Sequence, residues 1–165
     1  MVTSRKYNIQ EQLRKWLSGA ERVVIAGIGN PIRMDDFVGG KIVQDLQGKV
    51  SDKVMLIECE TVPEGYMQQI IDFKPTHVLL IDAAILGLKP GKTRFIGPEE
   101  LRDSPAFLTH LLPLRLFCEY VGKETGAKIR LLLVEPEKTD FGEGLTPEVS
   151  ASAQNIAKVL FGLFD

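Results

Sequence analysis

A chain of 165 residues with 44% hydrophobic and 25% charged residues has the size and composition of one globular domain, so we treat residues 1–165 as a single domain. These proportions argue against a disordered chain, and the lack of any apolar run of about eighteen residues argues against membrane insertion. A formal net charge of -2 without a basic stripe argues against nucleic acid as a partner.

The N-terminal segment, residues 1–16, is charged and amphipathic. It lacks the apolar core and the small-residue cleavage site of a secretory signal, so we expect a cytoplasmic protein. Cys59 and Cys118 lie far apart and outside any Cys-x-x-Cys pattern, which predicts two reduced, partly buried thiols rather than a zinc site or a disulfide framework.

Helices are expected where apolar residues recur every three or four positions, and strands where short apolar runs stand between turns. In chain order, these patterns predict a helix after Asn8, a strand over 22–26, a helix over about 36–46, a strand over 53–58, a helix beginning at Pro63, a strand over 77–83, an edge strand over 92–96, a helix opening near His110, a last strand over 128–134 and a closing helix capped by Thr146. This order predicts the α/β class, as a three-layer α/β/α sandwich around a mainly parallel sheet of about five strands.

The turn over residues 27–39 is the stretch around which the rest of the chain is organised. It reads Gly-Ile-Gly-Asn-Pro-Ile-Arg-Met-Asp-Asp-Phe-Val-Gly and joins the first strand to the next helix. Glycines and an asparagine allow a sharp bend, and the carboxyl ends of strands are where ligands bind in an open α/β sheet. One aspartate suffices to cap the helix, which leaves the other of Asp35 and Asp36 as a candidate for chemistry.

A second acid stands in a comparable place. Asp82 ends the most continuous apolar run of the chain, residues 77–83, and such a run predicts a central strand covered on both faces. An acid here can simply accept hydrogen bonds from loop amides. Its position at a carboxyl end nevertheless matches that of Asp36, so both acids are expected at one edge of the sheet.

The chain has two histidines, and they differ in their surroundings. His77 directly precedes a strand, and we expect it at the surface. His110 lies among apolar residues, where an unpaired imidazole would be costly to bury, although a satisfied capping role is also open to it. If His110 converges with Asp36 and Asp82, the three offer two oxygens and one nitrogen to a divalent ion, with coordination positions left open.

Four motifs, taken together and in order, resemble the [NiFe]-hydrogenase maturation endopeptidases. They are Gly27-Ile28-Gly29-Asn30 with Asp35-Asp36, Ile81-Asp82-Ala83-Ala84 with Gly87-Leu88-Lys89-Pro90-Gly91, Thr109-His110-Leu111-Leu112-Pro113-Leu114, and Gly144-Leu145-Thr146-Pro147. The second and third look most like the type that serves hydrogenase 3 in formate hydrogenlyase complexes. The resemblance extends from about Val23 to the C-terminus.

The resemblance implies an endopeptidase that removes the C-terminal extension of a hydrogenase large-subunit precursor after nickel insertion. That precursor would be its partner, nickel would be carried by the substrate, and no organic cofactor would be needed. The family's metal-contacting positions, which are also its catalytic ones, fall on Asp36, Asp82 and His110. We assign substrate binding to Gly29, Asn30 and Thr61.

Two departures from the family pattern are visible. Phe37 stands where many members have glycine or alanine, and a loop that is often Asp-Gly-Gly-Thr reads Glu-Cys-Glu-Thr over residues 58–61. Glu58 and Glu60 add negative charge that either aids cation capture or is merely solvated. Asp35 would cap the helix, which we favour, or act as a general base.

Three alternatives stay open at this point. The same three residues would also suit a non-catalytic nickel-binding assembly factor. A cysteine peptidase would use a Cys59 thiolate with His110 as its base. A nucleotide-binding module is the weakest alternative, because the glycines after Gly29 come too late for the dinucleotide fingerprint. Within the favoured function, the metal would either identify the nickel-loaded precursor or also take part in catalysis, by polarising the scissile carbonyl or by lowering the pKa of its bound water.

Overall fold

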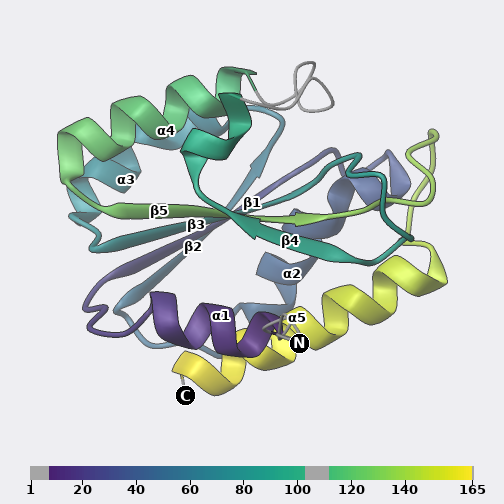
Figure 1. The fold of residues 1–165 in the computed structure, drawn as a ribbon, viewed down its shortest axis with the longest axis horizontal. Coiled ribbons are helices and arrows are strands. Elements are labelled where there is room, and N and C mark those ends of the chain that lie inside the picture. Colours follow the sequence, from purple (N-terminus) through teal and green to yellow (C-terminus); the bar gives the residue numbers. More distant parts are fainter. Residues whose placement is uncertain (1–7, 103–111, 165) are drawn as a thin grey trace, which may run out of the picture.

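The computed structural model describes residues 8–102 and 112–164. Its elements, with η marking short 3-10 helices, are α1 (Ile9–Trp16), β1 (Val23–Ile28), η1 (Met34–Phe37), α2 (Val38–Leu46), β2 (Val54–Glu60), η2 (Pro63–Tyr66), α3 (Met67–Phe73), β3 (His77–Ala83), β4 (Thr93–Ile96), η3 (Pro98–Arg102), α4 (Leu112–Thr125), β5 (Lys128–Val134) and α5 (Pro147–Phe164). Figure 1 shows the helices stacked on both faces of one sheet.

In the described part of the chain, the sheet has five strands in the order β2-β1-β3-β5-β4. Strands β2, β1, β3 and β5 run parallel, and β4 pairs antiparallel with β5 at the edge. The predicted mainly parallel sheet is therefore confirmed, as are the central strand over 77–83 and the edge strand over 92–96. Because the four parallel strands point the same way, their carboxyl ends share one edge of the sheet.

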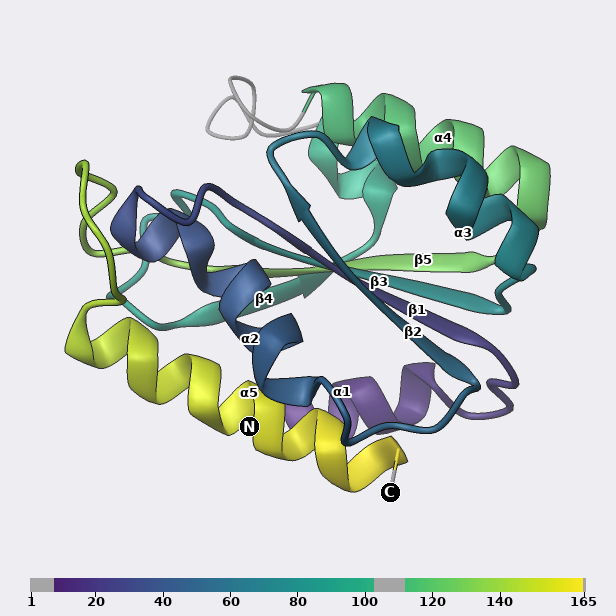
Figure 2. The ribbon, with the colours of Figure 1, turned by 180° about the vertical axis from the view of Figure 1, so that it is seen from behind.

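Two helical layers enclose this sheet. Helices α3 and α4 cover one face, and α1, α2 and α5 cover the other (Figure 1 and Figure 2). Alternate residues of β3 serve the two layers, since Val78 and Leu80 pack with the first set of helices and Leu79 and Ile81 with the second. Burying a Leu or Ile side chain contributes about 2 kcal/mol, so the unbroken apolar run of β3 stabilises both layers at once. The α/β/α sandwich is confirmed.

Helix α1 begins as predicted, because the Asn8 side chain accepts a hydrogen bond from the Glu11 backbone N–H at 2.9 Å. It covers the amino-terminal end of β3, where Trp16 lies edge-on to His77 with ring centroids 5.0 Å apart. His77 is only 3% exposed, so the expectation of a surface histidine was wrong. The cause is tertiary: a helix more than sixty residues earlier in the chain packs over it.

The helix after the glycine turn begins later than predicted. A 3-10 turn, η1, holds both aspartates, and the regular helix α2 starts only at Val38. Helix α5 begins at Pro147, directly after Thr146, as predicted. Within the described ranges, none of the helices combines the length and the apolar character that a bilayer crossing requires.

Candidate active site

The glycine turn folds so closely against the sheet that its glycines leave no room for a side chain. A Cβ on Gly27 would lie 2.2 Å from the Gly39 carbonyl oxygen, and a Cβ on Gly39 would lie 2.1 Å from the carbonyl oxygen of Ile81. The start of α2 therefore touches the ends of β1 and β3. This close approach carries Asp36 toward Asp82.

Asp36 is half-buried in η1, and its environment is set by the turn. Its Oδ2 accepts a hydrogen bond from the Asn30 backbone N–H at 2.9 Å, while the Asn30 side chain accepts one from the Ile32 N–H at 3.0 Å. Asn30 thus shapes the loop and fixes one oxygen of Asp36. Within the described residues no hydrogen bond reaches the other oxygen, which leaves it available to a ligand.

Asp82 lies at the end of β3 and is 6% exposed. Burial raises the pKa of its carboxyl group well above the usual range, and the negative charge of Asp36 raises this pKa further. The Ala83 N–H, which donates to Asp82 Oδ1 at 2.8 Å, opposes the shift. The charge of Asp36 acts on Asp82, so the two carboxyl groups lie close enough to interact. A cation bound there would relieve both the desolvation and the repulsion.

Of the three predicted metal-contacting residues, the structure brings Asp36 and Asp82 to the same edge of the sheet. His110 lies outside the described residues, so its place relative to the acid pair stays a prediction. In the part of the chain that the structure describes, no group of three or more His, Cys, Asp or Glu side chains is positioned to hold a metal ion.

The predicted substrate-binding residues lie near the acid pair in the fold. Gly29 adopts φ = 142°, and its N–H donates to the Glu60 carbonyl oxygen at 2.7 Å. This bond ties the turn with Asn30 to the end of β2, where Thr61 follows and is exposed. The two loops therefore border the same edge. The role of these residues in binding a substrate stays a prediction.

Comparison with known proteins identifies the family. A family model described as hydrogenase maturation protease matches residues 40–162. The chain belongs to the hydrogenase maturation protease family. A Methanocaldococcus jannaschii chain named as a hydrogenase maturation protease is 30% identical over 165 residues, covering 95% of this chain and 96% of the relative. The Escherichia coli hydrogenase 3 maturation protease is 24% identical over 139 residues, covering 84% and 88%.

Solved structures give the same result. The crystal structure of the [NiFe] hydrogenase maturation protease HycI from Thermococcus kodakarensis KOD1 superposes with a TM-score of 0.86 at 32% identity, covering 93% of this chain and 98% of that one. The resemblance found in the motifs is thus confirmed, and the chain is a peptidase. Likeness to hydrogenase 3 maturation proteases agrees with the subtype that the second and third motifs suggest.

Within this protease, Asp35 does not cap a helix, so that prediction was wrong. The residue at the cap position of α2 is Phe37, and no side chain among the described residues caps that helix. Asp35 is fully buried, and its carboxylate accepts four hydrogen bonds from the loop that follows β5. The donors are the Glu137 N–H (2.9 Å), the Lys138 N–H (3.0 Å) and the N–H and hydroxyl of Thr146 (both 2.7 Å).

A further buried acid, Glu135, was not among the residues predicted for the site. It directly follows β5 and is 6% exposed. Its two carboxylate oxygens accept hydrogen bonds from the Leu86 N–H at 2.7 Å and the Leu88 N–H at 3.0 Å. Glu135 therefore fixes the loop that leaves Asp82. The only sequence signal was an acid directly after a buried strand, which is the signal that singled out Asp82.

The two departures from the family pattern also have local explanations. The Phe37 ring packs over α2, where a Cβ on Gly40 would lie 2.2 Å from its Cε1 atom. A glycine three positions later therefore accommodates the large side chain. Glu58 is half-buried, and its Oε1 accepts a hydrogen bond from the Gln44 side chain at 2.9 Å. One oxygen of the Glu58 carboxylate is therefore already bonded to α2.

Cys59 is poorly suited to act as a nucleophile. It is fully buried on β2, and burial, with the charges of Asp82 and Glu64, raises the pKa of its thiol to about 12. A thiolate is the reactive form of cysteine, and this environment holds the proton on sulfur. Cys118 is also buried, and burial raises its pKa to about 12 as well. The surroundings of Cys59 thus argue against the cysteine peptidase alternative.

Proposed function

We propose that this protease removes the C-terminal extension from the precursor of a [NiFe]-hydrogenase large subunit after nickel has been inserted. The observation that carries the proposal is the pair formed by Asp36 and Asp82 at the carboxyl edge of the sheet. Asp36 keeps one oxygen to which no described residue donates a hydrogen bond, and Asp82 is buried beside its negative charge. The names of the E. coli and T. kodakarensis relatives supply the substrate class.

In this proposal, nickel belongs to the substrate. Asp36, Asp82 and His110 would contact the ion already seated in the precursor, and this contact would align the scissile peptide bond for attack by water. Oxygen and imidazole donors both suit a divalent ion such as nickel. The reaction consumes one water and yields a new carboxylate and a new amine, so no organic cofactor is required.

The deciding experiment incubates the protease with nickel-loaded and with nickel-free precursor and follows the intact mass of the large subunit. We expect loss of the extension only from the nickel-loaded form. Asp36→Ala and His110→Ala should fold normally and leave the precursor uncleaved. Asp45→Ala is a matched control, because Asp45 lies on α2 in a surface ion pair with Lys41 at 3.1 Å.

The outcomes of these experiments distinguish the proposed endopeptidase from the assembly factor and the cysteine peptidase. Normal cleavage by Asp36→Ala and His110→Ala would overturn the site assignment. Nickel-dependent binding of the precursor by the wild-type protease without any change in mass would instead favour the assembly-factor alternative. Loss of cleavage in a Cys59→Ser variant that folds normally would favour the cysteine peptidase.

A further inference from the structure

Large apolar side chains are exposed around the edge of the sheet that carries the acid pair. They belong to the loops that follow β1, β2, β3 and β5, and in the described residues they are Ile32, Val62, Ile85, Leu88 and Phe141. Phe141 is the most exposed of them, at 83%. Exposed apolar groups gathered near a functional edge mark an interaction surface.

Phe141 and Ile32 lie on two loops that are joined backbone to backbone. The Gly142 N–H donates to the Ile32 carbonyl oxygen at 2.8 Å, and the Met34 N–H donates back to the Gly142 carbonyl oxygen at 3.1 Å. Arg33 and Gly142 form a β-bridge between these bonds. Figure 1 and Figure 2 both show the loop after β5 beside the segment that leads into α2. The two exposed side chains are therefore held next to the turn that carries Asp36.

Asp35 joins the same two loops by hydrogen bonds. Besides the four hydrogen bonds to its carboxylate, its backbone N–H donates to the Lys138 carbonyl oxygen at 3.0 Å. A buried carboxylate satisfied by four donors orders the loop over 137–146 without help from Phe141. The Phe141 ring is thus presented to solvent by a fixed backbone, which lowers the entropy lost when a partner binds.

We propose that Phe141 and Ile32 receive an apolar segment of the precursor beside the acid pair, and that Asp35 is the positioning residue that holds Phe141 there. The inference rests on the proposed function and adds the surface by which the substrate is recognised. An aromatic side chain on a rigid support is the usual form of an energetic anchor in protein interfaces. Leu, Ile, Val or aromatic side chains in the precursor would match this surface.

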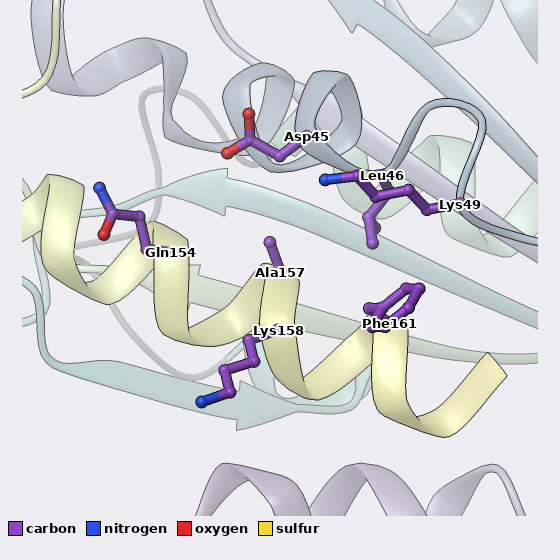
Figure 3. Close-up of a pocket in the computed structure, with 7 residues that line it drawn as sticks. All are labelled: Asp45, Leu46, Lys49, Gln154, Ala157, Lys158 and Phe161. Atoms are coloured by element: carbon purple, nitrogen blue, oxygen red, sulfur yellow. The ribbon is translucent and has the colours of Figure 1, made fainter. Parts of the chain in front are cut away.

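The chain offers a matched control for Phe141. Phe161 on α5 is also an exposed phenylalanine, at 40%, but it lines a largely apolar pocket of about 350 Å³ between α2 and α5. Figure 3 shows this ring beside Lys49, which follows the end of α2. The η1 turn with the acids leads into the opposite end of the same helix. Truncating Phe161 thus removes a similar ring far from the proposed contact.

The test measures the dissociation constant of nickel-loaded precursor, together with kcat and KM for its cleavage. Phe141→Ala should raise the dissociation constant and KM about tenfold and leave kcat unchanged, because the ring contacts the substrate away from the scissile bond. Phe141→Leu should restore most of the affinity, and Phe161→Ala should behave as wild type. Asp35→Asn should raise KM and also speed amide hydrogen exchange over 137–146, which Phe141→Ala should leave slow.

Each result decides something. If Phe141→Ala cleaves the precursor normally, with the dissociation constant and KM of wild type, this inference is overturned and the proposed function is not affected. An equal loss in Phe161→Ala overturns it too, since the effect would then not be specific to this surface. A wild-type protease that neither binds nor cleaves the precursor overturns the proposed function and this inference together. Unchanged hydrogen exchange in Asp35→Asn overturns the positioning role.

Discussion

The carboxylate of Asp35 accepts hydrogen bonds from both the backbone N–H and the hydroxyl of Thr146, each at 2.7 Å, across 111 positions of the sequence. Among the described residues, the side chain of the neighbouring Asp36 accepts one hydrogen bond, from the Asn30 N–H within its own turn. The adjacent acids therefore have separate tasks. Asp35 joins the turn after β1 to the loop after β5, and Asp36 is the acid that we propose for contact with the metal.

Replacing Asp35 should cost considerable stability. In Asp35→Asn, an amide NH₂ group faces donors that need an acceptor, and the charge that strengthens four hydrogen bonds is lost. We expect the free energy of unfolding to fall by about 3 kcal/mol, measured by urea denaturation. A fall of less than about 1 kcal/mol would mean that the buried network contributes little.

Replacing Asp36 should have little effect on stability but should abolish precursor processing. Asp36→Asn keeps an oxygen that can accept from the Asn30 N–H, and the side chain is only half-buried. The variant should unfold within about 1 kcal/mol of wild type and lose precursor processing. Wild-type processing in Asp36→Asn, or strong destabilisation with processing retained, would contradict the division of tasks between the two acids.

A further prediction concerns Gly39, where α2 approaches the sheet closely. In Gly39→Ala, the new methyl group would lie 2.1 Å from the Ile81 carbonyl oxygen, which is backbone and cannot rotate away. We expect α2 to shift, the free energy of unfolding to drop by about 2 kcal/mol or more, and cleavage to fall because Asp36 moves relative to Asp82. Urea denaturation and the intact-mass assay measure the two effects.

Gly162→Ala is the matched control, since Gly162 also lies in a helix. A Cβ there meets no atom of the described residues within 4 Å, and alanine favours the helix by about 0.5–1 kcal/mol. This variant should be slightly more stable than wild type and fully active. Equal losses of stability and cleavage in Gly39→Ala and Gly162→Ala would show that replacing any helical glycine has this effect, and that the contact of Gly39 with β3 is not its cause.

The strands were predictable because their signals are local. The run over 77–83 is apolar throughout because both faces of β3 are covered, and residues 92–96 alternate because β4 lies at the edge. Asp36 and Asp82 could be assigned to one edge for a similar reason. Asp82 lies at the end of one parallel strand and Asp36 in the turn that follows another, so the topology predicts both acids at the carboxyl edge of the sheet.

The errors share a different cause. Asp35 was assigned to a helix cap because its actual partners lie more than a hundred residues later and leave no local pattern. His77 was expected at the surface because nothing near it in sequence announces the helix that covers it. Glu135 was not predicted for the site because its partners belong to the loop over 84–91. Residues that join distant loops are seen only once the chain has folded.

The thiols should be inert in the folded protein. With a pKa of about 12 for both Cys59 and Cys118, about one thiol in ten thousand is ionised at pH 8. Iodoacetamide at pH 8 should leave the intact mass unchanged until urea unfolds the chain, after which both sites should be alkylated. Cys59→Ala should still process the precursor, as should Cys118→Ala. Rapid alkylation of native Cys59 would reopen the cysteine peptidase alternative.

His77 should make stability depend on pH near neutrality. Burial lowers the pKa of its imidazole below the usual 6.5. An interaction with the Trp16 backbone opposes this shift, and the positive charge of Lys128, its register partner on β5, adds to it. Below about pH 6.5 the unfolded chain takes up a proton that the folded chain resists, so stability is lost as pH falls and is fully retained above that value.

The measurement compares urea denaturation at pH 7.5 and pH 5.5 for wild type and His77→Asn. Carboxylates contribute the same background to both proteins, so the difference between their pH responses isolates the imidazole. Wild type should lose up to about 1 kcal/mol more than His77→Asn over this interval. Equal responses would mean that His77 takes up its proton as readily in the folded protein as in the unfolded chain, and that its burial beneath α1 carries no electrostatic cost.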